Sequence, residues 1–432
     1  MVGETGDRFL VEGGRPVGGT LVPAGNKNEA LPALAATLLA PGACTLENVP
    51  DIRDVRTMLE ILVELGVSAG PLAPGRALRL DSAGLASRAP SSQLGATIRG
   101  SFLLAPGLLH RTGRAQLPRP GGDRIGRRRV DTHLHALRLL GAEVEVSERR
   151  YELRLDGRFR GGDIFLDEAS VMATENAVMA AAVADGSTRI ANAASEPHVQ
   201  GLCRFLNAMG ARISGVGTNV LDVEGVAELR PASHRVGPDH IEIGSFLAIA
   251  AMTGGELRIE DTNPDDLRMI RMVFARLGVQ VEVDGRALRV PPKQDLAIQD
   301  DLDGAIPKVD DAPWPGFPSD LTPIALVLAT QSRGTVLIHE KMFENRLFFV
   351  DRLSSMGARI VLCDPHRAIV TGPAELSGET LSSPDIRAGM ALLAAALCAR
   401  GRSEIMNAHQ VDRGYERIAE RLGALGAEIT RT

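Results

Sequence analysis

One pattern recurs six times along the 432-residue chain: a helical run ends in Leu or Met and then Gly, and a short β-rich run follows the glycine. The repeats lie 68 to 79 residues apart, with their glycines at Gly66, Gly141, Gly210, Gly278, Gly357 and Gly426. A glycine after the last helical turn suits the left-handed backbone position that ends many helices. The spacing therefore predicts six similar units of about 70 residues, and repetition on this scale constrains the fold more than any single motif.

A second pattern alternates in phase with the first: a helix of small apolar residues, then Gly, then a strand, as in "ATENAVMAAAVADGSTRIANA" and "IGSFLAIAAMTGGELRIED". These helices are apolar on nearly all faces, which predicts that they are buried. The helices of the first pattern, such as "DIRDVRTMLEILVEL", carry charge on one face and should lie outside. We therefore expect an α/β protein of two similar domains, each built from three repeated α/β units with buried inner helices.

Composition supports two domains and limits the partners. A chain of 432 residues is too long for one ordinary core, and 44% hydrophobic with 24% charged residues describes a soluble globular protein. The net charge of −6 argues against nucleic acid or a membrane surface as a general partner. The four cysteines are scattered without metal-ligand spacing. With no recognisable signal peptide at its start, the sequence indicates a cytoplasmic protein without a metal or cofactor.

Several of the buried helices begin with charged or polar residues instead of bland ones. Lys27 and Asn28 open the first, Arg99 the second, Asp320 the fifth, and Asp385 with Arg387 the sixth. An aspartate there serves equally well as an N-cap, which is the alternative for Asp385. Cations at a helix N-terminus oppose the helix dipole, so they indicate an anionic ligand, with a structural ion pair as the alternative.

Two further cations, Arg346 in "MFENRLFF" and Arg413 in "QVDRGYERI", extend this set across both expected domains. If these residues converge in a cleft between the domains, they form a site for a small, multiply charged ligand such as a phosphorylated acid.

The loop over about residues 117–130, "LPRPGGDRIGRRRV", places a single acid among arginines. Asp123 follows two glycines, and seven arginines lie between Arg111 and Arg129. Its prolines and glycines suit a lid that closes over a bound anion and brings a carboxyl group to it. In the alternative reading, Asp123 pairs with Arg124 or Arg127 in an open loop.

Eight collinear motifs give the chain a family resemblance along nearly its whole length: "GNKNEALP", "TIRGS", "PGGDRIGRRRVDTH", "NAASEPHV", "FPSDLTP", "MFENRLF", "PDIRAG" and "DRGYERI". The chain resembles the enolpyruvyl transferases, and within them the branch that acts on UDP-N-acetylglucosamine in peptidoglycan synthesis. This resemblance implies an inside-out α/β barrel in each domain. It also implies a first domain over 27–237 that carries the catalytic loop, a second over 1–26 plus 238–432, and an active site in the cleft between them.

The resemblance also implies the chemistry: transfer of the enolpyruvyl group of phosphoenolpyruvate to the sugar 3-hydroxyl, with release of phosphate. The catalytic residues would be Asp123, Asp320, Lys27 and Arg413, with Asp320 taking the proton of the acceptor hydroxyl and Asp123 protonating C3. The residues that bind phosphoenolpyruvate would be Lys27, Arg99, Arg128, Arg346, Arg387 and Arg413. Those that bind the nucleotide sugar would be Asn28, Arg99, Arg128, Arg129, Val130, Asp131, His133, Ser170, Val171, Asp320, Met342 and Phe343.

The sequence departs from the family pattern at informative positions. Family members usually carry a cysteine where Asp123 stands, and epoxides of the fosfomycin type alkylate that thiol, so we expect this chain to be resistant. Glu168 stands where Lys is frequent, and the segment "IGRRRVD" has an extra Arg where a proline often packs on the uracil ring. These departures keep open a different uridine nucleotide such as UMP as acceptor, or a non-catalytic nucleotide-binding paralogue. We expect small molecules as the only partners and a monomer or weak homo-oligomer.

Overall fold

The computed structural model describes residues 7–73, 75, 77–123 and 125–432, and the chain divides into two compact units. The first unit comprises Gly25–Gly122 and Arg128–Gly237. The second comprises the stretch that ends at Ala24, Asp123–Arg127 and Pro238–Thr432. Each unit is described by itself below. Among the described residues, no helix has both the length and the apolar character needed to cross a bilayer.

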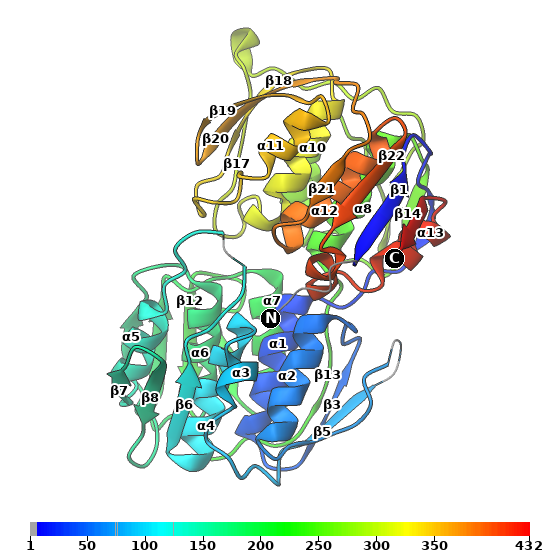
Figure 1. Ribbon diagram of the computed structural model, residues 1–432. Helices are drawn as coiled ribbons and strands as arrows, with labels where there is room; N and C mark the ends of the chain where they lie inside the picture. The colour runs from blue at the N-terminus through cyan, green and yellow to red at the C-terminus, as the bar shows by residue number, and fades with distance from the viewer. Residues whose placement is uncertain (1–6, 74, 76, 124) are drawn as a thin grey trace. The chain divides into compact units, whose positions relative to one another are not determined.

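The first unit contains three sheets around inner helices (Figure 1). Its inner helices are α1 (Lys27–Ala36) with η1 (Thr37–Leu39), η2 (Arg99–Leu104) running into α4 (Ala105–Thr112), and α6 (Val171–Ala182). Its other helices are α2 (Arg53–Glu64), α3 (Ser92–Gly95), α5 (Asp131–Leu139) and α7 (Pro197–Ala208). In sheet order its strands are β13 (Ser233–Arg235), β3 (Ala43–Glu47), β5 (Leu78–Asp81) and β4 (Ser68–Ala69); β6 (Arg114–Pro118), β8 (Arg150–Arg154) and β7 (Glu143–Val146); and β11 (Arg212–Ser214), β12 (Val220–Glu224), β10 (Ser187–Ala191) and β9 (Asp163–Phe165).

The second unit repeats this plan. Its inner helices are α8 (His240–Thr253), α10 (Thr322–Gln331) and α12 (Ile386–Cys398). Its other helices are α9 (Arg268–Arg276), α11 (Val350–Ser355), α13 (Ile418–Ala424), η3 (Leu302–Gly304), η4 (Ser319–Leu321) and η5 (Ala408–Arg413). In sheet order its strands are β15 (Glu282–Asp284), β16 (Ala287–Val290), β14 (Leu257–Ile259) and β2 (Gly19–Leu21); β17 (Lys308–Asp310), β18 (Gly334–His339), β20 (Arg367–Gly372) and β19 (Arg359–Asp364); and β21 (Thr380–Ser382), β22 (Arg402–Met406), β1 (Arg8–Glu12) and β23 (Glu428–Arg431).

Strand pairing shows the repeat directly. In all five four-stranded sheets of the described chain, one edge strand is parallel to its neighbour and the other two pairings are antiparallel. The remaining sheet, β6-β8-β7, has the two antiparallel pairings without a parallel edge strand. The six sheets therefore correspond to the six repeats expected from the sequence, and the predicted α/β class is confirmed.

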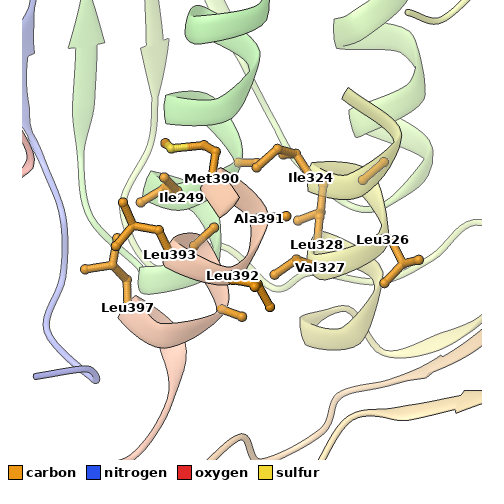
Figure 2. Packing of buried hydrophobic residues seen from close by; sticks show 14 of the residues in the cluster. Ile249, Ile324, Leu326, Val327, Leu328, Met390, Ala391, Leu392, Leu393 and Leu397 are labelled. Carbon is orange, nitrogen blue, oxygen red and sulfur yellow. The ribbon is translucent and has the colours of Figure 1, made fainter. Parts of the chain in front are cut away.

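The apolar helices of the second pattern are the inner ones. The second unit's α8, α10 and α12 contact one another, and Ile249, Val327 and Leu393 lie in their shared packing (Figure 2). Every residue from Ile386 to Leu397 in α12 is buried, whereas α2 alternates buried and exposed positions. The prediction that helices apolar all round fill the centre is confirmed, since only such helices bury every face without exposing charge.

The predicted helix-ending glycines also lie where the sequence placed them. All six have positive φ, from 94° at Gly426 to 105° at Gly210 and Gly357. A β-carbon is disfavoured in this left-handed conformation, so each helix ends there and the chain turns into the next strand.

The two ends of the chain complete sheets of the second unit. Strand β1 lies between β22 and β23, and β2 pairs in parallel with β14. The five-residue segment Asp123–Arg127 also groups with the second unit, although the residues on both sides of it belong to the first. This differs from the sequence analysis, which assigned the whole loop over 117–130 to the domain that contains residues 27–237.

A buried ion pair joins α8, α13 and the N-terminal segment. The Arg421 guanidinium donates from Nη1 to Glu242 Oε2 (2.7 Å) and from Nη2 to Glu242 Oε1 (2.8 Å), and Glu242 is 2% exposed. The same carboxylate accepts the Ala24 N–H at 2.9 Å. Removing one member of a buried pair leaves an uncompensated charge.

We therefore expect Glu242→Ala to lower the free energy of unfolding of the second unit by about 3 kcal/mol. Urea unfolding followed by the fluorescence of Trp314, the sole tryptophan of the chain, measures this unit specifically. The matched control is Glu375→Ala, which removes an ion pair to Arg400 whose two side chains are 76% and 75% exposed. We expect a change below about 0.5 kcal/mol in the control. Equal losses in the two variants would contradict the assignment.

Candidate functional site

In the second unit, two buried arginines hold one aspartate at the start of an inner helix. Asp320 lies in η4 immediately before α10, and its Oδ1 accepts from Arg346 Nη2 at 2.8 Å. Its Oδ2 accepts from Arg387 Nε at 2.9 Å and lies 2.8 Å from Arg387 Nη2. The arginine side chains are only 2% and 3% exposed, against 28% for Asp320. The carboxylate is therefore the solvent-accessible member of the group.

The two arginines are fixed by more than their shared carboxylate. Arg346 lies over the Phe343 ring at 5.3 Å, and Arg387 lies over the Tyr415 ring at 5.4 Å. Burial alone would lower the pKa of Arg387, but the neighbouring Asp320 carboxylate and Tyr415 raise it above its usual value. Two guanidinium groups that lie side by side on one carboxylate are an arrangement that suits an anionic ligand.

Asp385 serves as the N-cap of α12, as one of the two readings of the sequence held. Its Oδ1 accepts the N–H groups of Arg387 (2.9 Å) and Ala388 (3.0 Å). Burial raises the pKa of Asp385, and Arg346 opposes this shift. The cap fixes the first turn of α12 and therefore the place from which Arg387 extends.

The loop acid Asp123 pairs with Arg413 in this unit. The Arg413 guanidinium and the Asp123 carboxylate form an ion pair with side chains 15% and 13% exposed. Next to it, the Asn345 N–H donates to the Ile125 carbonyl (3.0 Å) and the Arg127 N–H to Glu344 Oε2 (3.2 Å). The structure thus holds Asp123 beside Arg413 instead of in the expected alternative pair with Arg127; Arg124, the other expected partner, lies outside the described residues.

In the first unit, Lys27 and Asn28 are the first two residues of α1, whose N-cap is Asn26. Lys27 Nζ lies 3.6 Å from Asp54 Oδ2, and the two side chains are 12% and 7% exposed. Asp54 lies in the first turn of α2. The lysine is therefore partly balanced by a carboxylate that the sequence analysis did not single out.

Arg99 and Arg128 form a second cationic group in this unit. Arg99 opens η2 and donates to the carbonyls of Arg128 (3.1 Å) and Arg129 (2.6 Å). Burial, and next the charge of Arg128, lower the pKa of Arg99 to about 10. Like charges held together at this cost indicate a site that accepts an anion.

The predicted nucleotide strip surrounds the start of α5. Arg129 pairs with Asp131 (3.4 Å) and Asp167 (3.0 Å), and Thr132 donates to Asp167 at 2.7 Å. Val130, half-buried, is the N-cap position of the helix. These contacts fix the strip, with Asp167 as a positioning group that the sequence analysis did not name.

His133, predicted in the same strip, faces the interior. It is 1% exposed, its Nδ1 lies 2.9 Å from Asn176 Nδ2, and its ring packs edge-on against Phe102. Burial and the charges of Arg99 and Arg128 lower its pKa to about 3. The side chain is therefore neutral at physiological pH and packs α5 against Phe102 and Asn176 in the interior.

Ser170 and Val171 stand at the start of α6. Ser170 is the N-cap, with its hydroxyl 3.4 Å from the Ala173 N–H, and both residues are half-buried. Met342 and Phe343 lie in the turn after β18, and Met342 is 40% exposed. These four residues therefore lie at a helix start or in a turn. Among the described residues, no group of His, Cys, Asp and Glu side chains is arranged to hold a metal ion.

Comparison with known proteins decides the family. The family model described as EPSP synthase (3-phosphoshikimate 1-carboxyvinyltransferase) matches residues 11–422. The chain belongs to the enolpyruvyl transferase family. It is 53% identical to the UDP-N-acetylglucosamine 1-carboxyvinyltransferase of Treponema denticola over 421 residues, and 53% identical to that of Bradyrhizobium diazoefficiens over 424, with 98% of each chain covered.

Solved structures show that this enolpyruvyl transferase has the family fold. The enolpyruvyl transferase NikO from Streptomyces tendae matches with a TM-score of 0.88 at 25% identity, covering 99% of both chains. An EPSP synthase from Acinetobacter baumannii matches with a TM-score of 0.75 at 18% identity, covering 99% of this chain and 100% of that one, which concerns the fold only. The expected inside-out α/β barrel of the family is thereby confirmed.

Proposed function

We propose that this enzyme transfers the enolpyruvyl group of phosphoenolpyruvate to the 3-hydroxyl of UDP-N-acetylglucosamine, with release of phosphate, as the first committed step of peptidoglycan synthesis. The observation that carries the proposal is 53% identity over 98% of both chains to relatives named for this reaction. Both substrates are metabolites of the cytoplasm, and we place the reaction there.

The charged groups of both units suit the two substrates. Arg346, Arg387 and Arg413 in the second unit would bind the phosphate and carboxylate of phosphoenolpyruvate. Lys27, Arg99 and Arg128 in the first unit would add to that charge, since a trianionic substrate needs several cations to replace its water. Asn28, Phe343 and the strip around Arg129 would hold the acceptor nucleotide.

The reaction then runs as addition followed by elimination. Asp320 takes the proton of the 3-hydroxyl as its oxygen bonds to C2 of phosphoenolpyruvate, and Asp123, in its protonated form, gives its proton to C3. The resulting tetrahedral ketal carries the phosphate on C2. Loss of a proton from C3 expels phosphate and restores the double bond, which leaves the enolpyruvyl ether on the sugar. Arg413, paired with Asp123, would orient the loop acid and stabilise the departing phosphate.

A second candidate keeps the reaction but takes a nucleotide with a shorter phosphate chain, such as UMP. The observation that favours it is Glu168, an exposed carboxylate near enough to interact with Arg99, at the strip where the diphosphate would lie. A negative charge there disfavours a second phosphate group.

Phosphate release from phosphoenolpyruvate, with UDP-N-acetylglucosamine and UMP offered separately, distinguishes the candidates. We expect turnover with the nucleotide sugar and a product whose mass shows the added enolpyruvyl group. Turnover with UMP alone would establish the second candidate. No turnover with either nucleotide, together with retained nucleotide binding, would indicate a non-catalytic paralogue.

A further inference from the structure

Two carboxyl groups lie buried together next to the segment that carries Asp320. Strands β17 and β18 are parallel neighbours in which Asp310 stands opposite His339. The residue that follows each strand is an acid, so Asp311 and Glu340 lie next to each other where the two strands end. Both residues are 0% exposed.

This pair, Asp311 with Glu340, connects three segments by hydrogen bonds. Glu340 Oε1 accepts from the Ser319 hydroxyl at 2.7 Å and from the Phe343 N–H at 3.2 Å. The Asp311 carboxyl group accepts the N–H of Lys341 and, at 3.3 Å, that of Met342. The end of β17, the turn η4 and the turn after β18 are therefore held to one another through these two side chains.

The connected segments are those that present the proposed reacting group. Ser319 directly precedes Asp320 in η4, and the turn after β18 leads through Phe343 to Arg346, which binds Asp320. A shift of Glu340 would move Asp320 through Ser319 and would move its arginine partner through the turn. Both side chains of the pair are 0% exposed, so solvent does not reach them.

The two carboxyl groups interact with each other in a way that requires a proton. Burial, together with the charge of Asp311 and a side-chain hydrogen bond to it, raises the pKa of Glu340 to about 8, although Arg346 and Ser319 oppose the shift. The charged and titratable groups around Glu340 include Asp311, Arg346 and His366, whose Nδ1 lies 2.7 Å from the Glu340 carbonyl oxygen. A hydrogen bond between two carboxyl groups exists only while one of them is protonated.

We propose that Glu340 and Asp311 hold one proton between them, and that this protonated pair is the positioning element that fixes Asp320 for proton abstraction. The inference rests on the proposed function, in which Asp320 is the base. It assigns to Glu340 a role that acts through Ser319 and the turn after β18, without contact to substrate.

The test compares Glu340→Gln with Glu340→Ala. A glutamine reproduces the protonated acid, because its oxygen accepts from Ser319 and Phe343 while its amide donates to Asp311. We expect E340Q to keep kcat at pH 7 within about threefold, and E340A to lose about 100-fold in kcat because the base is misplaced. KM of E340Q for both substrates should change by less than about threefold, since the glutamine keeps the hydrogen bonds to Ser319 and Phe343 that hold the turn. Glu375→Gln, on the surface of the same unit, is the control for loss of a carboxylate.

The pH profile separates positioning by a protonated pair from simple packing. At pH 9, one unit above a pKa of about 8, about a tenth of the wild-type pairs would keep the proton. We therefore expect kcat of wild type to fall about tenfold relative to E340Q between pH 7 and 9.

The pH dependence of stability is an independent test for the shared proton. The folded pKa of Glu340 is raised, so wild type loses stability as pH rises from the unfolded value of 4.5 towards about 8, whereas E340Q does not. The Tm of E340Q minus that of wild type should therefore grow by about 3 °C or more between pH 6 and 8.

The outcomes decide the inference. Wild-type kcat in E340A would overturn this inference without affecting the proposed function. So would an E340Q variant with the pH profile of wild type and with a Tm that follows pH as wild type does. A wild-type enzyme inactive with both nucleotides would overturn the proposed function, and this inference with it.

Discussion

Replacement of Asp320 by Asn should lower kcat by about 1,000-fold, because the acceptor hydroxyl then lacks the group that takes its proton. The amide is nearly the same size as the carboxylate and still accepts a hydrogen bond from Arg346 or Arg387. It carries no charge, however, and its NH₂ group would face one of the two guanidinium groups. The variant thus removes the base with little change in shape.

The same substitution should weaken the second unit, since Arg346 and Arg387 lose the carboxylate that they share at 2.8 to 2.9 Å. We expect a loss of about 2 kcal/mol, because these arginines are almost fully buried. Unfolding followed by Trp314 fluorescence shows whether D320N is folded at the assay temperature, and Asp295→Asn, which breaks an exposed pair with Arg333, is the matched control. A folded D320N with kcat within fivefold of wild type would refute the role of Asp320 as base.

Much of the fold was predictable because each repeat carries two separate sequence patterns, one for its inner helix and one for its outer helix. Helices apolar on all faces have one stable place, the centre of a unit, and a glycine after the last helical turn marks where each outer helix ends. The assignment of the N-terminal strands had a weaker signal. Strand β1 lies between β22 and β23, and pairing between residues about 390 to 420 positions apart leaves no trace in local periodicity.

Candidate site residues could be singled out from the sequence where a residue contradicts its local environment. Lys27, Arg99 and Arg387 oppose a helix dipole, and Asp123 interrupts a run of arginines. Partners that are ordinary in their own segment were missed. Asp54 looks like a normal first-turn acid of α2, and Glu340 like a polar residue at a strand end. Their partners, Lys27 and Asp311, are 27 and 29 positions away in the sequence and become neighbours only in the folded chain.

His133 shows that a motif does not reveal the direction in which a side chain points. Its motif placed it in the nucleotide strip, yet in α5 the residues from Thr132 to Leu134 are buried together with Ala136 and Leu137. The helical period thus turns the imidazole inward, while Asp131, two residues earlier, stays exposed. A motif gives the position of a residue in the chain, but the period of the helix decides which side chains of the motif reach a ligand.

Replacement of Asp123 by Cys should leave an active enzyme and make it sensitive to an epoxide of the fosfomycin type. A carboxylate paired with Arg413 is a poor nucleophile towards an epoxide. We therefore expect the half-life of wild-type activity in millimolar epoxide to stay within about tenfold of the half-life in buffer. At the same position the guanidinium of Arg413 would stabilise a thiolate, which is the reactive form of cysteine. D123C should therefore inactivate progressively with time.

The decisive readout is the position of the label. Mass spectrometry should find one epoxide adduct on residue 123 of D123C and none on that residue of wild type. Asp123→Ala should lower kcat about 100-fold and should resist the epoxide, because it offers neither a proton for C3 nor a nucleophile. The native thiol Cys363 is exposed, and the comparison is therefore made in a Cys363→Ser background.

Either result bears on how the loop works. If D123C is active and labelled, a carboxyl group and a thiol are interchangeable as the acid on this segment, and Arg413 is the common partner that holds it. If wild type is inactivated with time and carries the adduct on Asp123, the expected resistance is wrong, and the carboxylate must leave Arg413 often enough to attack. If D123A keeps full activity, the proton for C3 comes from another group, and the ion pair serves only to attach the segment Asp123–Arg127 to the second unit.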